Sequence, residues 1–561
     1  MAVLDQARYT PRRLADWVYG IDVTNDSETG IRPWVMGDIV HSQPLAINYG
    51  CADTASDCPT DKQRIRIFAG TNEGLLHAID DANGSERWAF WPRESASMAV
   101  YRMLNTRPEY PWPDTSGGQQ YFSQSTHYGV DGSPGAWLDY DATPDSAGRR
   151  HSTLENAVLA FGFGRGGRGY YGLNVLDPDK PTLAWHVVAP DWGQSWSTPV
   201  AVTLADGRAV FLVGMGYDIT TGSRADRGPA RFGAGMAVID AQKGTVIASL
   251  KGPKDSVPAT ITPVDRDFDG AVDGAFFGDT GGNVWFADLQ LGDNGRGGKR
   301  TTADWQLHQV ASLGRHDPEG IERSFFNRAN LVRTYLDQKP VDLLMLGSGD
   351  RANPLRDDNR DAFYIIDVSS WLDGNPNGSF PGILSNNELI EVSSPTSTYT
   401  LGAPVDQKGY LNMKAFRGWR LMLPAGEKVL SDASTIAGNT LFTTYQPEVP
   451  ADMCMAARGA SRLYGFSLPV WHDNGHRHEQ QVATVKSTDM GGYLQETPAL
   501  LIEGLRTRVL DSEKAGLVAE VLKNGEGASG SGSNNDCGQY DAEDGAFREC
   551  LVTAPLWWYQ Q

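Results

Sequence analysis

Short apolar runs separated by glycine-marked turns recur along this chain. The clearest copy begins with residues 67–70, turns at Gly74, continues through residues 75–80, turns again at Gly84 and reaches Trp88. Runs of four to six apolar or β-branched residues bounded by glycine are typical of β-strands and too short for helices. Each copy therefore predicts a strand, a tight turn, a second strand ending in aspartate, and a third strand.

Degenerate copies of this unit follow along most of the chain. Their strands are expected at residues 158–162 and 172–177, 210–214 and 236–240, 277–288, 343–349 and 362–367, 441–444 and 463–466, and in a last copy between about 496 and 521. Small sheets repeated in this way can pack face to face in a ring, which leaves few exposed edges. The predicted fold class is all-β: a modified, about seven-bladed β-propeller with irregular blade inserts.

Three segments are expected along the chain. They are an N-terminal lead-in with a short helix near residues 12–19 (residues 1–30), the propeller (residues 31–525), and a flexible loop with a closing segment (residues 526–561). The largest insert lies between about residues 94 and 150. Glycine, serine and asparagine dominate residues 524–536, a composition typical of flexible linkers.

Charge and hydropathy narrow the possible partners. The 561 residues carry a net charge of −20, which argues against nucleic acid or an anionic membrane as the main partner. The sequence has no run of about 18 apolar residues, so no transmembrane segment is expected. It also begins without the apolar core of a signal peptide, which indicates either a cytosolic protein or a fragment of a longer exported chain.

Cysteine usage favours the exported alternative. Cys51 and Cys58 bracket one short polar loop and Cys537 and Cys550 bracket another, each at a spacing that a local disulfide could close, and Cys454 is left over. A zinc site is disfavoured, because the sequence has no C-x-x-C pair and no histidine cluster beside these cysteines.

The most specific candidate site is an aspartate loop at residues 265–273. Asp265, Asp267, Asp269 and Asp273 stand at loop positions 1, 3, 5 and 9, with a glycine at position 6. Calcium takes six to eight oxygen ligands, and the backbone carbonyl at position 7, here Ala271, is a usual donor in such loops. We therefore expect a Ca²⁺ site formed by the four carboxylates and this carbonyl.

The flanks of this loop differ from those of a helix-loop-helix calcium sensor. Position 12, which would hold a bidentate glutamate, is Phe276, and both flanks favour strands and turns. The alternatives are an Asp/Gly turn that holds no metal, and Mg²⁺, which uses fewer protein ligands. A second ion at the acidic stretch 357–361 is possible, although a solvated loop is the simpler interpretation.

Enzymatic interpretations of the sequence are less well supported. Residues 162–167 fit G-x-G-x-x-G, but the following segment favours a strand and cannot supply the helix that binds a pyrophosphate. The sequence contains neither H-E-x-x-H nor H-x-x-E-H. A quinone-dependent dehydrogenase propeller is the main enzymatic alternative, and a plain adhesin or lectin module with structural calcium is another alternative.

Five ordered motifs connect the chain to a known family. They are GDIVHSQP at residues 37–44 after Trp34, GTNEGLLHA at 70–78, VDGSP at 130–134, SWSTP at 195–199, and GDTGGNVW at 278–285 directly after the aspartate loop. Together they resemble the C-terminal domain of the PilY family of type IV pilus proteins, over nearly the whole chain from about residue 12. The repeat alone is shared with many quinoprotein-like propellers, whereas the ordered set is specific.

The resemblance implies a function. In this family, calcium in the loop controls the balance between pilus extension and retraction, and with it twitching motility and surface adhesion. The ligands that the resemblance implies are Asp265, Asp267, Asp269, the carbonyl of Ala271, and Asp273. It also implies a non-enzymatic, exported protein at the pilus tip, outer membrane or cell surface, whose partners are pilins, minor pilins, and host or abiotic surfaces.

Overall fold

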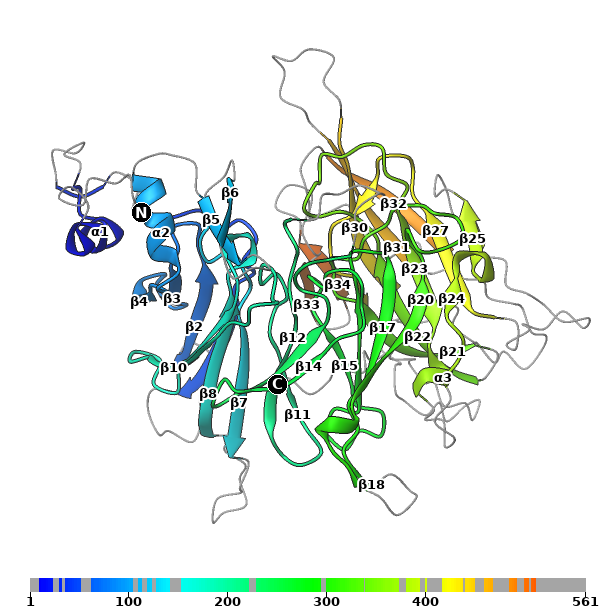
Figure 1. Cartoon of the computed structure of the whole chain (residues 1–561), viewed down its shortest axis with the longest axis horizontal. Helices are drawn as coiled ribbons and strands as arrows, with labels where there is room; N and C mark the ends of the chain where they lie inside the picture. Colours follow the sequence, from blue (N-terminus) through cyan, green and yellow to red (C-terminus); the bar gives the residue numbers. More distant parts are fainter. Residues whose placement is uncertain are drawn as a thin grey trace, which may run out of the picture. The chain divides into compact units, whose positions relative to one another are not determined.

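A computed structural model of the chain shows how these elements are arranged (Figure 1). The structure describes residues 10–23, 30–32, 36–51, 62–103, 109–113, 119–123, 128–141, 153–220, 229–293, 299–336, 339–372, 380–393, 399–400, 416–436, 439–448, 459–467, 484–491, 499–503 and 506–510. These residues form two compact units. The first comprises Met1–Gly222, Gly228–Pro263 and Leu289–Trp305, and the second comprises Ser223–Arg227, Val264–Asp288 and Gln306–Gln561.

The first unit contains three four-stranded antiparallel sheets. Their strands are β1 (Leu45–Cys51), β2 (Gln63–Gly70), β3 (Leu76–Asp80) and β4 (Glu86–Phe90); β7 (Gly135–Asp141), β8 (Thr153–Gly162), β9 (Tyr170–Asn174) and β10 (Thr182–Val187); and β11 (Val200–Thr203), β12 (Ala209–Gly214), β13 (Met236–Asp240) and β14 (Val246–Leu250). The same unit also has two small hairpins: β5 (Glu109–Pro113) with β6 (Gln119–Ser123), and β18 (Gly292–Asp293) with β19 (Lys299–Arg300).

The second unit is built from larger sheets. Their strands are β15 (Thr262–Val264), β16 (Gly274–Gly278), β17 (Asn283–Asp288), β20 (Gln306–Ser312) and β24 (Leu384–Ser385); β21 (Asn330–Leu336), β22 (Lys339–Gly347), β23 (Ala362–Asp367), β27 (Gly418–Met422) and β25 (Ile390–Ser393); and β26 (Tyr399–Thr400), β32 (Thr484–Gly491), β31 (Ala460–Ser467), β30 (Asn439–Gln446) and β28 (Lys428–Val429), with β29 (Ser434–Ile436) also on β30.

The strand pattern confirms the repeat that the sequence predicts. The predicted pairs of apolar runs up to residue 466 become two adjacent antiparallel strands of one sheet, as in β2 and β3 or β30 and β31. In the last copy, the first predicted run lies in β33 (Ala499–Glu503), which pairs with β34 (Arg506–Leu510), whereas its predicted partner at residues 516–519 lies outside the described residues. The aspartate that ends many second strands caps the next turn: Oδ1 of Asp240 accepts from the backbone N–H groups of Gln242 and Lys243.

Within each unit, successive sheets pack face to face. Alternate side chains of a strand point to opposite faces, and β8 follows this rule: Leu159 and Phe161 lie in one apolar cluster, shared with β2 and β3. Val158 and Ala160 lie in the next cluster, shared with β12 and β13. Because both faces of such a central strand are covered, its buried segment, residues 157–162 in β8, has no polar side chain at any position, which hides the two-residue period.

Helices are few in the described part of the chain: α1 (Pro11–Val18), α2 (Ser95–Met103) and α3 (Ser369–Leu372). The first confirms the predicted lead-in helix. Thr10 caps it by accepting from the Arg13 N–H at 3.3 Å, and Leu14 and Trp17 pack into a cluster with Leu75. Within the described residues, no helix has the length and apolarity needed to span a membrane.

Several predictions fall partly or wholly outside the described residues. Cys51 is disulfide-bonded, but Cys58, Cys454, Cys537 and Cys550 lie outside them. The closing segment 526–561 also lies outside, and the segment boundaries at residues 30 and 525 remain predictions. The G-x-G-x-x-G segment lacks the helix of a dinucleotide-binding site, as predicted. A short 3₁₀ turn (Gly164–Gly166) leads into strand β9 rather than into an α-helix.

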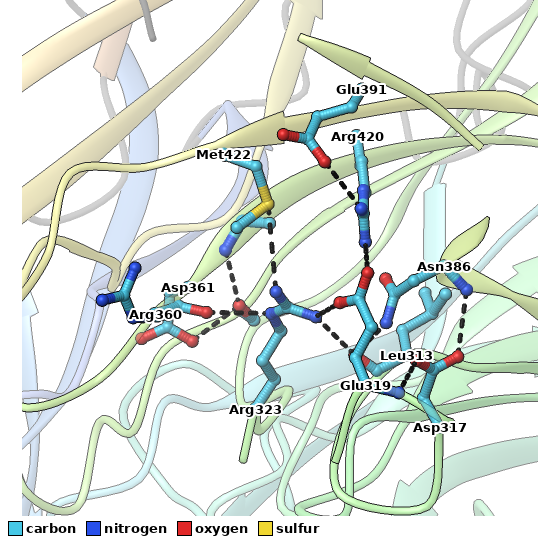
Figure 2. Close-up of polar contacts among 12 residues, drawn as sticks. Leu313, Asp317, Glu319, Arg323, Arg360, Asp361, Asn386, Glu391, Arg420 and Met422 are labelled. Atoms are coloured by element: carbon cyan, nitrogen blue, oxygen red, sulfur yellow. Dashed lines mark hydrogen bonds and ion pairs between the residues drawn. The ribbon is translucent and has the colours of Figure 1, made fainter. Parts of the chain in front are cut away.

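A buried polar network ties a crossing segment to two sheets of the second unit (Figure 2). Residues 384–393 add β24 to the edge of β20 and β25 to the edge of β27, both in parallel. The Asn386 amide donates to the carbonyl of Leu313 at 3.1 Å, and its backbone N–H donates to Asp317 at 3.0 Å. Arg420 bridges Glu319 and Glu391, both at 2.6 Å.

Arg323 lies at the centre of this network and is 1% exposed. Its Nε donates to the carbonyl of Arg360 at 2.9 Å and its Nη1 to the carbonyl of Leu313 at 3.0 Å. The carboxylate of Glu319 lies 3.6 Å from Nη1. No sequence motif indicates this centre, because its members come from four separate segments.

Asp361, beside this network, is predicted to make stability depend on pH. It is buried and accepts from the Ser348 hydroxyl at 2.6 Å and the Asn359 amide at 2.5 Å. Burial raises its pKa from 3.8 to about 6. The folded chain therefore holds more protons than the unfolded chain between about pH 4 and 6, so this residue's contribution to stability falls as pH rises through that window.

The measurement is denaturant unfolding of the wild type and Asp361→Asn between about pH 4 and 7. Relative to the variant, the wild type should lose roughly 3 kcal/mol of unfolding free energy as pH rises through this window. Parallel pH profiles for the two proteins would contradict the assignment.

Candidate metal centre

The aspartate loop connects β15 to β16, at one end of a five-stranded sheet. Two hydrogen bonds close its base. The backbone N–H of Asp273 donates to the carbonyl of Val264 at 2.8 Å, and the backbone N–H of Arg266 donates to Oδ2 of Asp273 at 2.9 Å. The predicted strand flanks are confirmed, so residues 265–273 form a loop between two β-strands and not within a helix pair.

Three of the predicted ligands converge. Asp265, Asp267 and Asp269 each offer a carboxylate oxygen, and these three oxygens lie within 4.8 Å of one another. Among the described residues, this is the one group of three or more His, Cys, Asp or Glu side chains placed to share a metal ion. The acidic stretch 357–361 forms no such group, since its Asn359 and Asp361 are buried in hydrogen bonds with each other and with Ser348.

Local hydrogen bonds hold these carboxylates in place. Oδ2 of Asp265 accepts from the Gly270 N–H at 2.9 Å, and Oδ1 of Asp269 accepts from the Ala271 N–H at 2.8 Å. The contact from the Asp269 N–H to Oδ1 of Asp267 is longer, at 3.4 Å. Acceptance by an aspartate from the N–H two residues ahead, as in Asp267 and Asp269, is typical of Asx turns, whereas Asp265 accepts from an N–H five residues ahead and so ties the two ends of the loop together.

One oxygen of the site is buried without a partner. Oδ1 of Asp265 is inaccessible to solvent and accepts no hydrogen bond. A buried carboxylate oxygen without a partner is costly, because it has lost its hydrogen bonds to water and gained none from the protein. A hard cation bound by oxygen ligands would satisfy this atom, so the residues present fit calcium.

The backbone of the loop takes two left-handed turns. Gly270 has φ = 89° and a Cβ there would meet no atom within 4 Å, so glycine is required by the backbone and not by crowding. Phe268 has φ = 61° and is the one non-glycine residue of the described chain with a positive φ. The sequence predicted the glycine at position 6 but contained no signal for this phenylalanine.

Asp273 and Ala271 remain predicted ligands that the structure does not add to the convergent group. One carboxylate oxygen of Asp273 is used by the Arg266 N–H. Burial is the largest cause that raises its pKa, and the nearby charges of Asp267 and Asp265 add to this. The hydrogen bond from Arg266 therefore assigns Asp273 to closing the base of the loop.

The strand pair after the loop depends on Asp279, a buried carboxylate that is not among the site residues predicted from the sequence. Asp279 is fully buried. It accepts from the backbone N–H groups of Gly281 and Asn283, from the Asn283 amide and, at 2.8 Å, from Nε1 of Trp285. This explains the GDTGGNVW motif physically: its aspartate fixes the β16–β17 turn that follows the loop.

Comparison with known proteins identifies the fold. Residues 36–303 match the family model described as the PilY1 beta-propeller domain. This segment of the chain is therefore similar to the PilY1 propeller family. The crystal structure of the Pseudomonas aeruginosa PilY1 C-terminal domain superposes with a TM-score of 0.55 at 19% identity, covering 80% of this chain and 91% of that one. The all-β propeller prediction is thus confirmed.

The relatives that match in sequence are much longer than the segment they share with this chain. PilY1 of P. aeruginosa strain UCBPP-PA14, described as a type IV pilus biogenesis factor, is 30% identical over 282 residues, which is 46% of this chain and 21% of the relative. A PilY1 homolog of Xylella fastidiosa is 24% identical over 504 residues, 81% of this chain and 31% of the relative. The matched part of the chain thus spans between a fifth and a third of the length of these PilY1 proteins.

Proposed function

We propose that this chain is a calcium-binding propeller of the type IV pilus machinery, and that calcium in residues 265–273 regulates pilus extension and retraction. Twitching motility and surface adhesion would follow from that balance. The observation that carries the proposal is the convergence of Asp265, Asp267 and Asp269, together with the buried Oδ1 of Asp265 that has no hydrogen-bond partner. The pilus context is supported by the names of the relatives.

The chemistry of the loop favours calcium binding over catalysis. The three convergent carboxylates would hold the ion, with Asp273 and the carbonyl of Ala271 completing an oxygen shell. Like charges no more than 4.8 Å apart repel each other by at least about 1 kcal/mol per pair even in a water-like dielectric, and bound calcium supplies the positive charge that offsets this. Together with the pilus context of the relatives, this supports the proposal of a non-enzymatic, exported protein that acts at the pilus tip, outer membrane or cell surface.

Regulation follows if a partner distinguishes the two states of the loop. Without a cation, repulsion among the carboxylates opposes the closed loop; with one, the closed loop is favoured. A pilin, a minor pilin or a surface that contacts only the closed loop would bind the loaded chain more tightly, since a ligand shifts an equilibrium only through its differential affinity.

The test is Asp267→Ala introduced into the full-length protein in its own host. In calcium-replete medium, we expect the variant to show the surface piliation and twitching zone of calcium-depleted wild-type cells, because it should not hold the ion. Asp206→Asn, which changes an exposed aspartate in the turn before β12, is the matched control and should behave as wild type. Wild-type twitching and a wild-type response to calcium in Asp267→Ala would contradict the proposal.

A further inference from the structure

We propose that the side chain of Phe268 is the contact by which a protein of the pilus machinery recognises the calcium-loaded loop. This inference rests on the proposed function and adds the recognising residue and the chemistry of the partner, namely a polypeptide surface with an apolar pocket that receives one aromatic ring.

Phe268 is placed where it contributes little to folding. It is 51% exposed, and its neighbours in sequence, Asp267 and Asp269, are both exposed carboxylates of the metal group. Burying a phenylalanine side chain is worth about 1.5–3 kcal/mol, and this fold forgoes much of that gain. Single exposed apolar residues are common, so a second observation is needed to give this one meaning.

The second observation is the backbone. A left-handed conformation costs about 1–2 kcal/mol for a residue with a Cβ, whereas glycine and asparagine adopt it readily. Phe268 adopts it at φ = 61°. A bulky aromatic residue is thus kept at a position where it strains the backbone and exposes its ring. Such costs are concentrated at functional sites, where the side chain is needed for something other than stability.

The ring is supported from one side by a fixed cation. The guanidinium of Arg333, on β21, lies 5.9 Å from the ring centroid, within the range of a cation–π contact. Asp342, directly opposite on β22, holds this guanidinium through two hydrogen bonds of 2.7 and 3.0 Å. The ring is therefore held against a rigid strand pair and is pre-organised for a partner, which lowers the entropy cost of binding.

Metal binding controls whether this arrangement persists. The two carboxylates that flank Phe268 belong to the convergent group, so an ion bound between them fixes the backbone on both sides of the ring. Without the ion, their repulsion opposes the closed loop and the ring loses its defined position. The metal site therefore determines whether an ordered aromatic side chain is presented on a polar surface.

The surrounding charge favours a protein partner over a membrane. Acidic side chains stand on both sides of the ring and the whole chain carries a net charge of −20, so an anionic lipid surface would be repelled. A protein pocket that buries the ring and carries basic groups at its rim would complement this surface in both apolarity and charge.

The test separates the effect of the aromatic ring on binding from the effect of the left-handed backbone. Phe268→Asn keeps a residue that tolerates the left-handed conformation but removes the ring, and Phe268→Leu keeps an apolar side chain. Leu355→Ala removes another exposed apolar side chain, 69% exposed and in the same unit, as a control. Each purified chain is titrated with calcium by calorimetry and then co-sedimented with purified type IV pili, with calcium or with chelator.

We expect the wild type to sediment with pili in calcium and not in chelator. Phe268→Asn should bind calcium as tightly as the wild type but bind pili at least about 10-fold more weakly, as expected for a lost aromatic anchor. Phe268→Leu should retain most of the binding, and Leu355→Ala all of it.

Each other outcome overturns the inference in a different way. If Phe268→Asn sediments like the wild type while Asp267→Ala does not, the loop is recognised without the ring and the proposed function survives. If Asp267→Ala also sediments like the wild type, calcium control itself fails. If the ring instead mediates binding to vesicles of phosphatidylethanolamine and phosphatidylglycerol, or to a glycan, and not to pili, the partner is not a protein.

Discussion

Calcium titrated into the chelator-stripped chain should bind at one site, and Asp265→Asn should weaken that binding by at least about 10- to 100-fold. The substitution conserves shape and leaves an oxygen able to accept from the Gly270 N–H. It removes the negative charge from the side chain whose other oxygen is buried without a partner. Ligand charge strongly tunes the affinity of such loops, so isothermal calorimetry should resolve the loss.

Two further variants sharpen this expectation. Asp206→Asn, outside the loop, should leave the affinity unchanged. Asp273→Ala tests the ligand that the structure does not place in the convergent group: a loss as large as that of Asp265→Asn would make it a full ligand, and a small loss would assign it to closing the loop through Arg266. Wild-type affinity in Asp265→Asn would refute the site.

Thermal unfolding of the loaded and stripped chains distinguishes a switch from a structural ion. Binding to the folded state stabilises it by about 4 kcal/mol when calcium exceeds the dissociation constant about 1,000-fold. Because this stabilisation depends only on how tightly the folded chain binds calcium, a site of micromolar, sensor-like affinity gives a smaller shift at the same calcium concentration than a site of nanomolar affinity. A large loss of stability on stripping would instead make calcium structural, and regulation would then rest on the pilus assay alone.

Arg323→Leu should destabilise the second unit by about 3–5 kcal/mol, because it removes two hydrogen bonds from a buried charged donor to backbone carbonyls, each worth about 1.5–3 kcal/mol. The leucine would leave the carbonyls of Leu313 and Arg360 without these donors, and Glu319 would lose one of its two arginine neighbours (Figure 2). A buried acceptor left without its donor costs far more than an exposed one.

Denaturant unfolding measures this effect, and an exposed pair supplies the control. Arg208 and Asp206 form a 2.6 Å ion pair in which both side chains are well exposed to solvent, so Arg208→Leu should change the unfolding free energy by less than about 1 kcal/mol. Similar small losses in Arg323→Leu and Arg208→Leu would show that the buried network does not hold the crossing segment 384–393.

The local parts of this protein could be predicted from its sequence. The strands β2, β3, β12 and β13 lie where short apolar runs end in glycine or aspartate, because both strand length and turn chemistry are set by neighbouring residues. The aspartate loop was recognisable for the same reason: its candidate ligands come from nine consecutive residues, so their spacing alone indicates a shared cation.

The sequence by itself determined the repeat, the loop, its strand flanks and the glycine at position 6. Only the tertiary structure decided which carboxylates converge, that one oxygen of Asp265 is buried without a partner, and that Phe268 is left-handed beside Arg333. It also revealed the network around Arg323, whose members come from segments far apart in the chain. The physical reason is that burial, charge pairing and backbone strain depend on how distant segments pack, whereas strands and turns depend mainly on adjacent residues.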